Sequence, residues 1–169
     1  MTQIAIPWRM RMGVVAVGYA GVFLISAFWI TQRYLAEKRN PDDFSGGMAA
    51  GGDWFLELII IGMLLVPTFL LALFIRDSEA SYTKFAKILF GFALTMPLSV
   101  GLMAIPVIGK SNNLLAFFPL YRVFAFPMTV VGFVGCAILA KFKRPRRLIL
   151  YSVGVEIATA VLMFTLTTL

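Results

Sequence analysis

The sequence contains no histidine and only one cysteine, Cys136, among its 169 residues. The absence of histidine excludes haem with a histidine ligand, most zinc and di-iron sites, and histidine-based acid–base chemistry. A single cysteine excludes an intramolecular disulfide bond. We therefore expect no metal site and no cofactor.

Charge is also scarce, because charged residues make up 14% of the chain and hydrophobic residues 60%, with a mean hydropathy of +0.90. Soluble domains are about 25% charged and about 45–50% apolar. The apolar residues form long runs, which are typical of membrane-spanning helices. The first run is too long for the apolar region of a signal peptide, so we expect no cleavage there. The sequence predicts an all-α, multi-pass membrane bundle that forms a single transmembrane domain over residues 1–169.

Five apolar runs are long enough to cross a hydrocarbon core of about 30 Å, which needs about 20 residues. We predict spans near residues 13–30, 54–75, 85–108, 119–140 and 148–168. The longest connection, residues 31–53, has a glycine-rich second half and is expected to be a flexible surface loop or a partner contact. Asn40 and Pro41 should end any helix that extends from the first span.

The basic residues indicate the orientation of these spans. The formal charge of +7 comes from Lys and Arg at the ends of apolar runs, and most of them lie on one side if the N-terminus is cytoplasmic. The positive-inside rule then predicts the N-terminus inside and the C-terminus outside. Aromatic belts at both boundaries agree with this orientation. The inner belt consists of Trp8, Tyr82 and Tyr151, and the outer belt consists of Trp29, Trp54 and Tyr121. A bacterial cytoplasmic (inner) membrane is the expected location, with an organellar inner membrane as the alternative.

A basic turn is predicted between the last two spans; it contains Lys141, Lys143, Arg144, Arg146 and Arg147. It has two interpretations. A tight cytoplasmic turn is basic for reasons of topology alone, whereas the same residues can bind lipid headgroups. Nucleic acid is not an expected partner, because the basic residues do not form an exposed patch among polar residues.

Apart from Lys87 at the cytoplasmic edge of the third span, three charged residues belong to the predicted spans: Glu57, Arg122 and Glu156. Such residues are functional candidates because charge is costly in a bilayer. Glu57 and Arg122 are each three residues from a predicted outer boundary, about 5 Å deep. They can form an ion pair or reach the interface separately. Asp53 and Glu57 share a helix face, which is a weak signal for a cation and is also expected at an ordinary polar helix entry.

Glu156 is predicted near the bilayer midplane, about 12 Å from the inner boundary. On the predicted boundaries it differs in depth from Arg122 by about 15 Å, which is too far for direct contact. Desolvation favours the neutral form of an isolated carboxyl group. Glu156 is then either a proton- or cation-responsive group, or a structural group that bonds across helices or pairs with a partner protein's basic side chain.

Three further patterns concern packing and ligands. The prolines in or beside predicted spans should kink helices, with nearby Thr and Ser hydroxyls supplying hydrogen bonds; they are Pro67, Pro97, Pro106, Pro119 and Pro127. Two stripes of small residues should allow close helix packing. The first, in the fourth span, is Gly132, Cys136 and Ala140, and the second, in the fifth span, is Gly154 and Ala158. An aromatic cluster could contact a partner or line a site for a quinone, a pigment or a lipid tail, although aromatic residues are also expected at an outer interface. It contains Phe117, Phe118, Tyr121, Phe124 and Phe126.

The sequence contains no Walker loop, G-x-S-x-G or H-E-x-x-H motif. The first hypothesis is therefore a non-enzymatic small subunit of a larger membrane assembly, in which Glu156 or the aromatic cluster faces another protein. The second is a small homo-oligomeric channel or transporter with a responsive Glu156. The third is a lipid-active membrane enzyme, which the different depths of Glu57 and Glu156 disfavour. The expected partners are membrane lipids, with other membrane subunits or further copies of the chain.

Overall fold

The computed structural model describes the backbone of residues 7–39, 47–103 and 114–168, and the side chains of 7–39, 51–103 and 119–165. This part of the chain contains helices and no strand. The helices are α1 Trp8–Arg39, α2 Gly47–Ile75, α3 Glu79–Ala93, α4 Thr95–Met103, α6 Leu114–Phe124, α7 Phe126–Leu139 and α8 Lys143–Thr168. Four described segments are long and apolar enough to cross a membrane: Trp8–Arg39, Gly51–Ile75, Glu79–Met103 and Lys143–Thr165. This set of apolar helices indicates a membrane-embedded protein.

The predicted connection over residues 31–53 is shorter than expected, because helices extend into it from both ends. Helix α1 continues to Arg39, nine residues past the predicted end of the first span. The prediction that Asn40 and Pro41 end this helix falls on residues outside the described part. Helix α2 begins at Gly47, so the glycines at 51 and 52 are helical and do not belong to a flexible loop. A helix satisfies its own backbone groups, which favours it over open loop in or beside a membrane. Residues 40–46 of the connection lie outside the described part.

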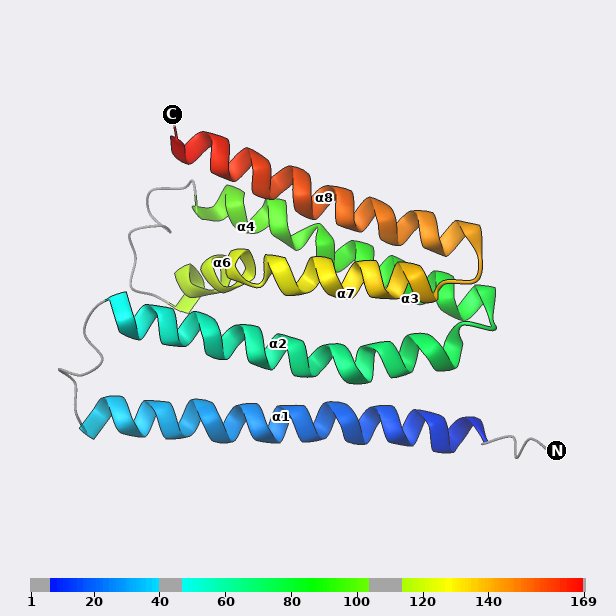
Figure 1. The fold of residues 1–169 in the computed structure, drawn as a ribbon, viewed down its shortest axis with the longest axis horizontal. Coiled ribbons are helices and arrows are strands. Elements are labelled where there is room, and N and C mark those ends of the chain that lie inside the picture. The colour runs from blue at the N-terminus through cyan, green and yellow to red at the C-terminus, as the bar shows by residue number, and fades with distance from the viewer. Residues whose placement is uncertain (1–6, 40–46, 104–113, 169) are drawn as a thin grey trace. The chain divides into compact units, whose positions relative to one another are not determined.

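The chain divides into two compact units, Met1–Phe74 and Ile75–Leu169. The first contains an antiparallel hairpin of α1 and α2 (Figure 1). Its helices meet closely where Gly18 faces Pro67, since a Cβ atom on Gly18 would lie 3.1 Å from the Pro67 Cβ atom. Beside this contact, the hydroxyl groups of Tyr19 and Thr68 share a hydrogen bond of 2.8 Å.

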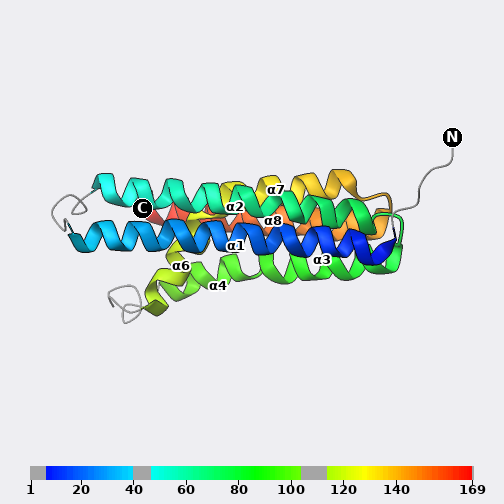
Figure 2. The ribbon, with the colours of Figure 1, turned by 90° about the horizontal axis from the view of Figure 1, so that it is seen from below.

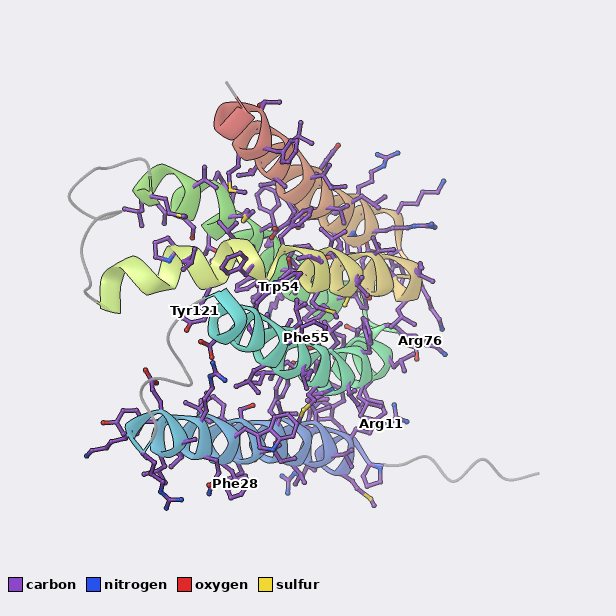
Figure 3. The ribbon with its side chains drawn as sticks, turned by 60° about the vertical axis from the view of Figure 1, so that its left-hand side comes forward. Arg11, Phe28, Trp54, Phe55, Arg76 and Tyr121 are labelled. Carbon is purple, nitrogen blue, oxygen red and sulfur yellow. The ribbon has the colours of Figure 1, made fainter. Side chains whose placement is uncertain are left out.

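Two contacts involving arginine lie nearer the ends of the same hairpin. Arg33 forms an ion pair with Asp53. At the other end the Arg11 guanidinium lies over the Phe74 ring, 5.9 Å from its centroid; Figure 3 labels Arg11 there. The hairpin is therefore joined at its middle and near both ends.

The second unit packs three helical segments together: α3 with α4, α6 with α7, and α8 (Figures 1 and 2). The α3–α4 segment and α8 run in the same direction, and α6–α7 runs opposite to them. Helix α3 packs on α8, and α8 also packs on α7. Each segment therefore has a neighbour of the same unit along much of its length.

Two of these segments are bent two or three residues before a proline. Leu94 separates α3 from α4 ahead of Pro97, and Ala125 separates α6 from α7 ahead of Pro127. A proline lacks the N–H group for the carbonyl four residues earlier, and its ring crowds that carbonyl. Hydrogen bonds continue through both bends, from the N–H of Leu94 and from the N–H of Ala125. The bends are therefore kinks within helical segments, as the prolines predicted.

Other prolines do not follow that prediction. Pro67 lies inside α2, which remains a single helix from Gly47 to Ile75, and Pro119 lies inside α6. Pro106 falls outside the described residues. Hydroxyl groups beside prolines bond carbonyls as expected, with Thr68 donating to Leu64 (2.7 Å) and Thr129 donating to Phe126 (2.9 Å).

Helix α8 begins at Lys143, five residues before the predicted span, so most of the predicted basic turn is helical. Pro145 is compatible with this start, because its missing N–H group lies in the first turn, where no helical partner is needed. Lys141, which precedes the helix, pairs with Asp77 at the surface. The connection between α7 and α8 is therefore shorter than the sequence predicted.

Two expectations about packing are corrected by burial. Tyr82, predicted in the inner aromatic belt, is fully buried, and its hydroxyl donates to the Cys136 carbonyl at 2.6 Å. Cys136 belongs to the buried small-residue stripe of α7, where a small side chain admits the tyrosine ring. The second stripe differs, because Gly154 and Ala158 are exposed in the described chain.

Candidate functional site: a buried arginine–glutamate pair

Arg122 and Glu156 form an ion pair inside the second unit. The Arg122 side chain is 3% exposed and the Glu156 side chain is fully buried. Arg122 belongs to α6 and Glu156 to α8, so the pair joins two helices through residues that are 34 positions apart in sequence. A buried pair of opposite charges requires further hydrogen bonds to offset desolvation.

Those hydrogen bonds come from the kink between α3 and α4. The Nε of Arg122 donates to the hydroxyl of Thr95 at 2.8 Å, and Nη2 donates to the Phe92 carbonyl at 3.4 Å. The Thr95 hydroxyl donates in turn to the same carbonyl at 2.6 Å. The bend ahead of Pro97 therefore supplies two of the acceptors for the buried guanidinium group.

Soft and aromatic groups complete the surroundings of Arg122. Its guanidinium carbon lies 4.6 Å from the centroid of the Phe92 ring, which is within cation–π distance. Nη1 points to the sulfur of the buried Met96 at 3.9 Å. The Phe92 ring packs edge-on against Phe133, with centroids 6.5 Å apart. Three helical segments of the unit thus converge on one cation.

Glu156 is less completely satisfied than Arg122. Its Oε1 accepts from Arg122, whereas Oε2 is buried and has no hydrogen-bond donor among the described residues. The Thr129 hydroxyl lies beside the carboxylate, but it donates to the Phe126 carbonyl at 2.9 Å. If the Thr129 hydroxyl rotated, it could donate a hydrogen bond to the Glu156 carboxylate instead of to the Phe126 carbonyl.

The sequence placed Arg122 and Glu156 too far apart for contact, and that prediction is wrong. The error lies in the predicted start of the fourth span, because α6 begins at Leu114 and Arg122 is eight residues into it. Eight residues correspond to about 12 Å, which brings Arg122 close to the depth of Glu156. The long arginine side chain covers the remaining distance. No local pattern signals this pairing, since the two residues lie in separate helices.

The other predicted site residues are placed differently. Asp53 pairs with Arg33, so the proposed cation face of Asp53 and Glu57 is partly occupied by arginine. No group of three or more His, Cys, Asp or Glu residues is gathered for a metal in the described chain. Glu57 belongs to the first unit, and its predicted pairing with Arg122 stays a prediction. Because Arg122 already has Glu156, that pair is no longer needed to neutralise the arginine.

The predicted aromatic cluster is only partly described. Tyr121 and Phe124 of α6 are 44% and 40% exposed, and Phe126 is half-buried. The side chains of Phe117 and Phe118 lie outside the described part. A contact with a partner, a lipid or another apolar ligand stays a prediction for this cluster. Glu156, in contrast, is fully buried and pairs with Arg122 of the same unit.

Comparison with protein-family models, with curated proteins and with solved structures finds no match to this chain. The functional argument therefore depends on the residues and their geometry.

Proposed function

We propose that this chain is a non-enzymatic small subunit of a larger membrane assembly, and that its α1–α2 hairpin binds the partner. The observation that carries the proposal is a pair of unsatisfied polar groups on the hairpin. The Oγ of Ser26 and the Oε2 of Glu57 are shielded from solvent and have no hydrogen-bond partner among the described residues. Such groups cost several kcal/mol in hydrocarbon, so a partner that supplies donors would stabilise the hairpin.

The hairpin also contains an apolar cavity of about 320 Å³. Ser26 lies in its wall together with residues of both helices, including Val22, Ile60 and Leu64. Glu57 lies on the same α2 stripe, three residues before Ile60. The proposed occupants are side chains from a helix of another membrane protein, because a lipid acyl chain cannot supply hydrogen bonds to Ser26 and Glu57.

The proposed topology has five crossings, with the N-terminus in the cytoplasm and the C-terminus outside. Four crossings are the long apolar segments, and the fifth consists of α6 and α7 joined through Ala125. These helices have 11 and 14 residues, which together span about 39 Å at the usual helical rise, more than the hydrocarbon core of about 30 Å. A bacterial cytoplasmic membrane is the proposed location, as the distribution of Lys and Arg predicts.

The first experiment is to extract the chain from its native membrane in mild detergent and to measure the mass and composition of the intact particle. Other membrane proteins at a fixed ratio are the expected result. Purification of this chain alone, as a monomer or as a homo-oligomer, would contradict the subunit proposal.

A matched pair of variants tests the hairpin as the contact. Ser26→Leu fills the cavity and should reduce the co-purified partner at unchanged expression. Phe28→Leu is the control, because Phe28 is 59% exposed and points away from α2 (Figure 3). Equal recovery of the partner with both variants would exclude the hairpin cavity as the binding site.

The second candidate function is a homo-oligomeric channel or transporter, and the Arg122–Glu156 pair is the observation that favours it. Transfer of a proton to Glu156 would leave the Arg122 charge uncompensated beside two kinked segments, which links protonation to helix movement. The flux of protons or cations into vesicles reconstituted with the Glu156→Gln variant should then differ from the flux with the wild-type chain. Unchanged flux, or no flux with the wild-type chain, would remove this candidate.

A further inference from the structure

A basic groove lies between α3 and α8 in the second unit, near the end where both helices begin (Figure 1). Its cavity has a volume of about 450 Å³. Thr83 and Lys87 of α3 form one wall, and Lys143, Arg144, Arg147 and Tyr151 lie on α8. A second cavity of about 550 Å³ shares Lys87 and Arg144 and adds Lys84 and Glu79. The two cavities therefore adjoin along the same pair of cations.

The groove extends from the helix ends into the apolar part of the unit. Lys87 is eight residues into α3 and Tyr151 is eight residues into α8, so each is about 12 Å from its helix start. Leu148 of the first cavity and the exposed ring of Tyr151 provide apolar surface on the α8 side. A molecule in this groove would meet cations from the helix ends to the depth of Lys87, with apolar groups of α8 beside them.

The charge of the groove is positive and largely uncompensated. None of its five cations takes part in the ion pairs found within the described residues, which use Arg33, Arg122 and Lys141. Among the described residues that line the two cavities, Glu79 is the only acidic one. The N-terminal ends of α3 and α8 add partial positive charge at the same end. An anion is therefore favoured, and basic pockets between membrane helices are suited to phospholipid headgroups.

We propose that this groove binds an anionic phospholipid with two phosphate groups, of the diphosphatidylglycerol class. Lys87 and Arg144 lie between the two cavities, so each phosphate can occupy one cavity while sharing these side chains. The acyl chains would follow Leu148 and Tyr151 into the membrane. This inference is independent of the partner proposed for the α1–α2 hairpin.

Native mass spectrometry of the full chain in mild detergent tests the site by titration with defined lipids. Diphosphatidylglycerol should bind more tightly than phosphatidylglycerol, and both more tightly than phosphatidylcholine. Inorganic pyrophosphate is included as the soluble phosphate probe. Equal affinity for the three lipids, or displacement of bound diphosphatidylglycerol by pyrophosphate at an equal concentration, would overturn the lipid proposal.

Two double variants distinguish lipid binding by the groove cations from attraction of lipid by all the positive charge at this end of the unit. Lys87→Gln with Arg144→Gln removes the shared cations and should weaken diphosphatidylglycerol binding about 30-fold. Lys141→Gln with Arg146→Gln removes the same charge beside the groove, including one exposed ion pair, and should have little effect. Equal weakening in both variants would show that only the basic end as a whole attracts lipid.

A charge-conserving variant tests whether misfolding causes the weaker lipid binding of the glutamine variant. Lys87→Arg with Arg144→Lys retains both charges and should restore most of the binding lost in the glutamine variant. Loss of binding in this variant with an unchanged melting temperature would contradict recognition by charge.

Discussion

At the scale of single residues, Arg122 shows how a charge is held inside a membrane protein. Its guanidinium contacts a carboxylate, a hydroxyl, a backbone carbonyl and an aromatic ring. These contacts replace the hydration that burial removes, and together they fix the positions of three helical segments. The free-energy penalty for removing one partner should therefore exceed the penalty for removing the pair.

A mutant cycle measures this difference. Glu156→Leu leaves the arginine charge buried and unmatched, so the free energy of unfolding should fall by about 3–5 kcal/mol. Arg122→Leu combined with Glu156→Leu removes both charges and should be clearly less destabilising than the sum of the single changes. The free energy of unfolding is measured in mixed detergent, with circular dichroism used to monitor the loss of helix. Strictly additive effects would show that the two side chains do not stabilise each other.

Thr95 provides a second test at this scale. Thr95→Val keeps the shape of the side chain but removes the acceptor for Arg122 Nε, so stability should fall by about 1.5–3 kcal/mol. Thr31→Val is a matched control, because Thr31 is exposed and bonds only to its own helix at the Ala27 carbonyl. Equal loss of stability in the two variants would contradict a specific role of the Thr95–Arg122 contact.

At the scale of helices, close approach depends on small residues at particular positions. Gly18 permits the contact with Pro67 in the α1–α2 hairpin, whereas a Cβ atom on Gly13 would meet nothing within 4 Å. Both glycines lie in α1, so the same substitution changes helix propensity to a similar extent at each position.

Gly18→Val should consequently lower stability by about 1–3 kcal/mol through overpacking, while Gly13→Val should have a small effect. The melting temperature of the purified chain in detergent, compared between the two variants, measures this. If Gly13→Val is as harmful as Gly18→Val, the loss arises from helix propensity and not from the contact with Pro67.

At the scale of the whole molecule, the proposed five crossings place the two ends of the chain on opposite sides of the membrane. Cys136 is buried and can be replaced by alanine, which leaves a background for single cysteines. Thr167→Cys should react with a membrane-impermeant maleimide in intact cells. Arg9→Cys and Ala80→Cys should react only after permeabilisation. Reaction of positions 9 and 167 from the same side would establish an even number of crossings.

The sequence by itself determined that this is an apolar, helical, membrane-embedded chain, because these properties depend on local composition and on helix length. It also predicted the bends ahead of Pro97 and Pro127, since proline acts on its own backbone. Helix starts at 47 and 143 were placed too late, because glycine and charged residues are compatible with both loops and helix ends.

Only the tertiary structure decided which side chains meet. It buried Tyr82 against Cys136 and brought Arg122 to Glu156, and it left Gly154 and Ala158 exposed. Each outcome depends on the direction in which a side chain points and on the relative depth of two helices. An error of five residues in one helix start changes the expected depth of a residue such as Arg122 by about 7.5 Å. An error of this size is enough for the sequence to predict no contact where an ion pair forms.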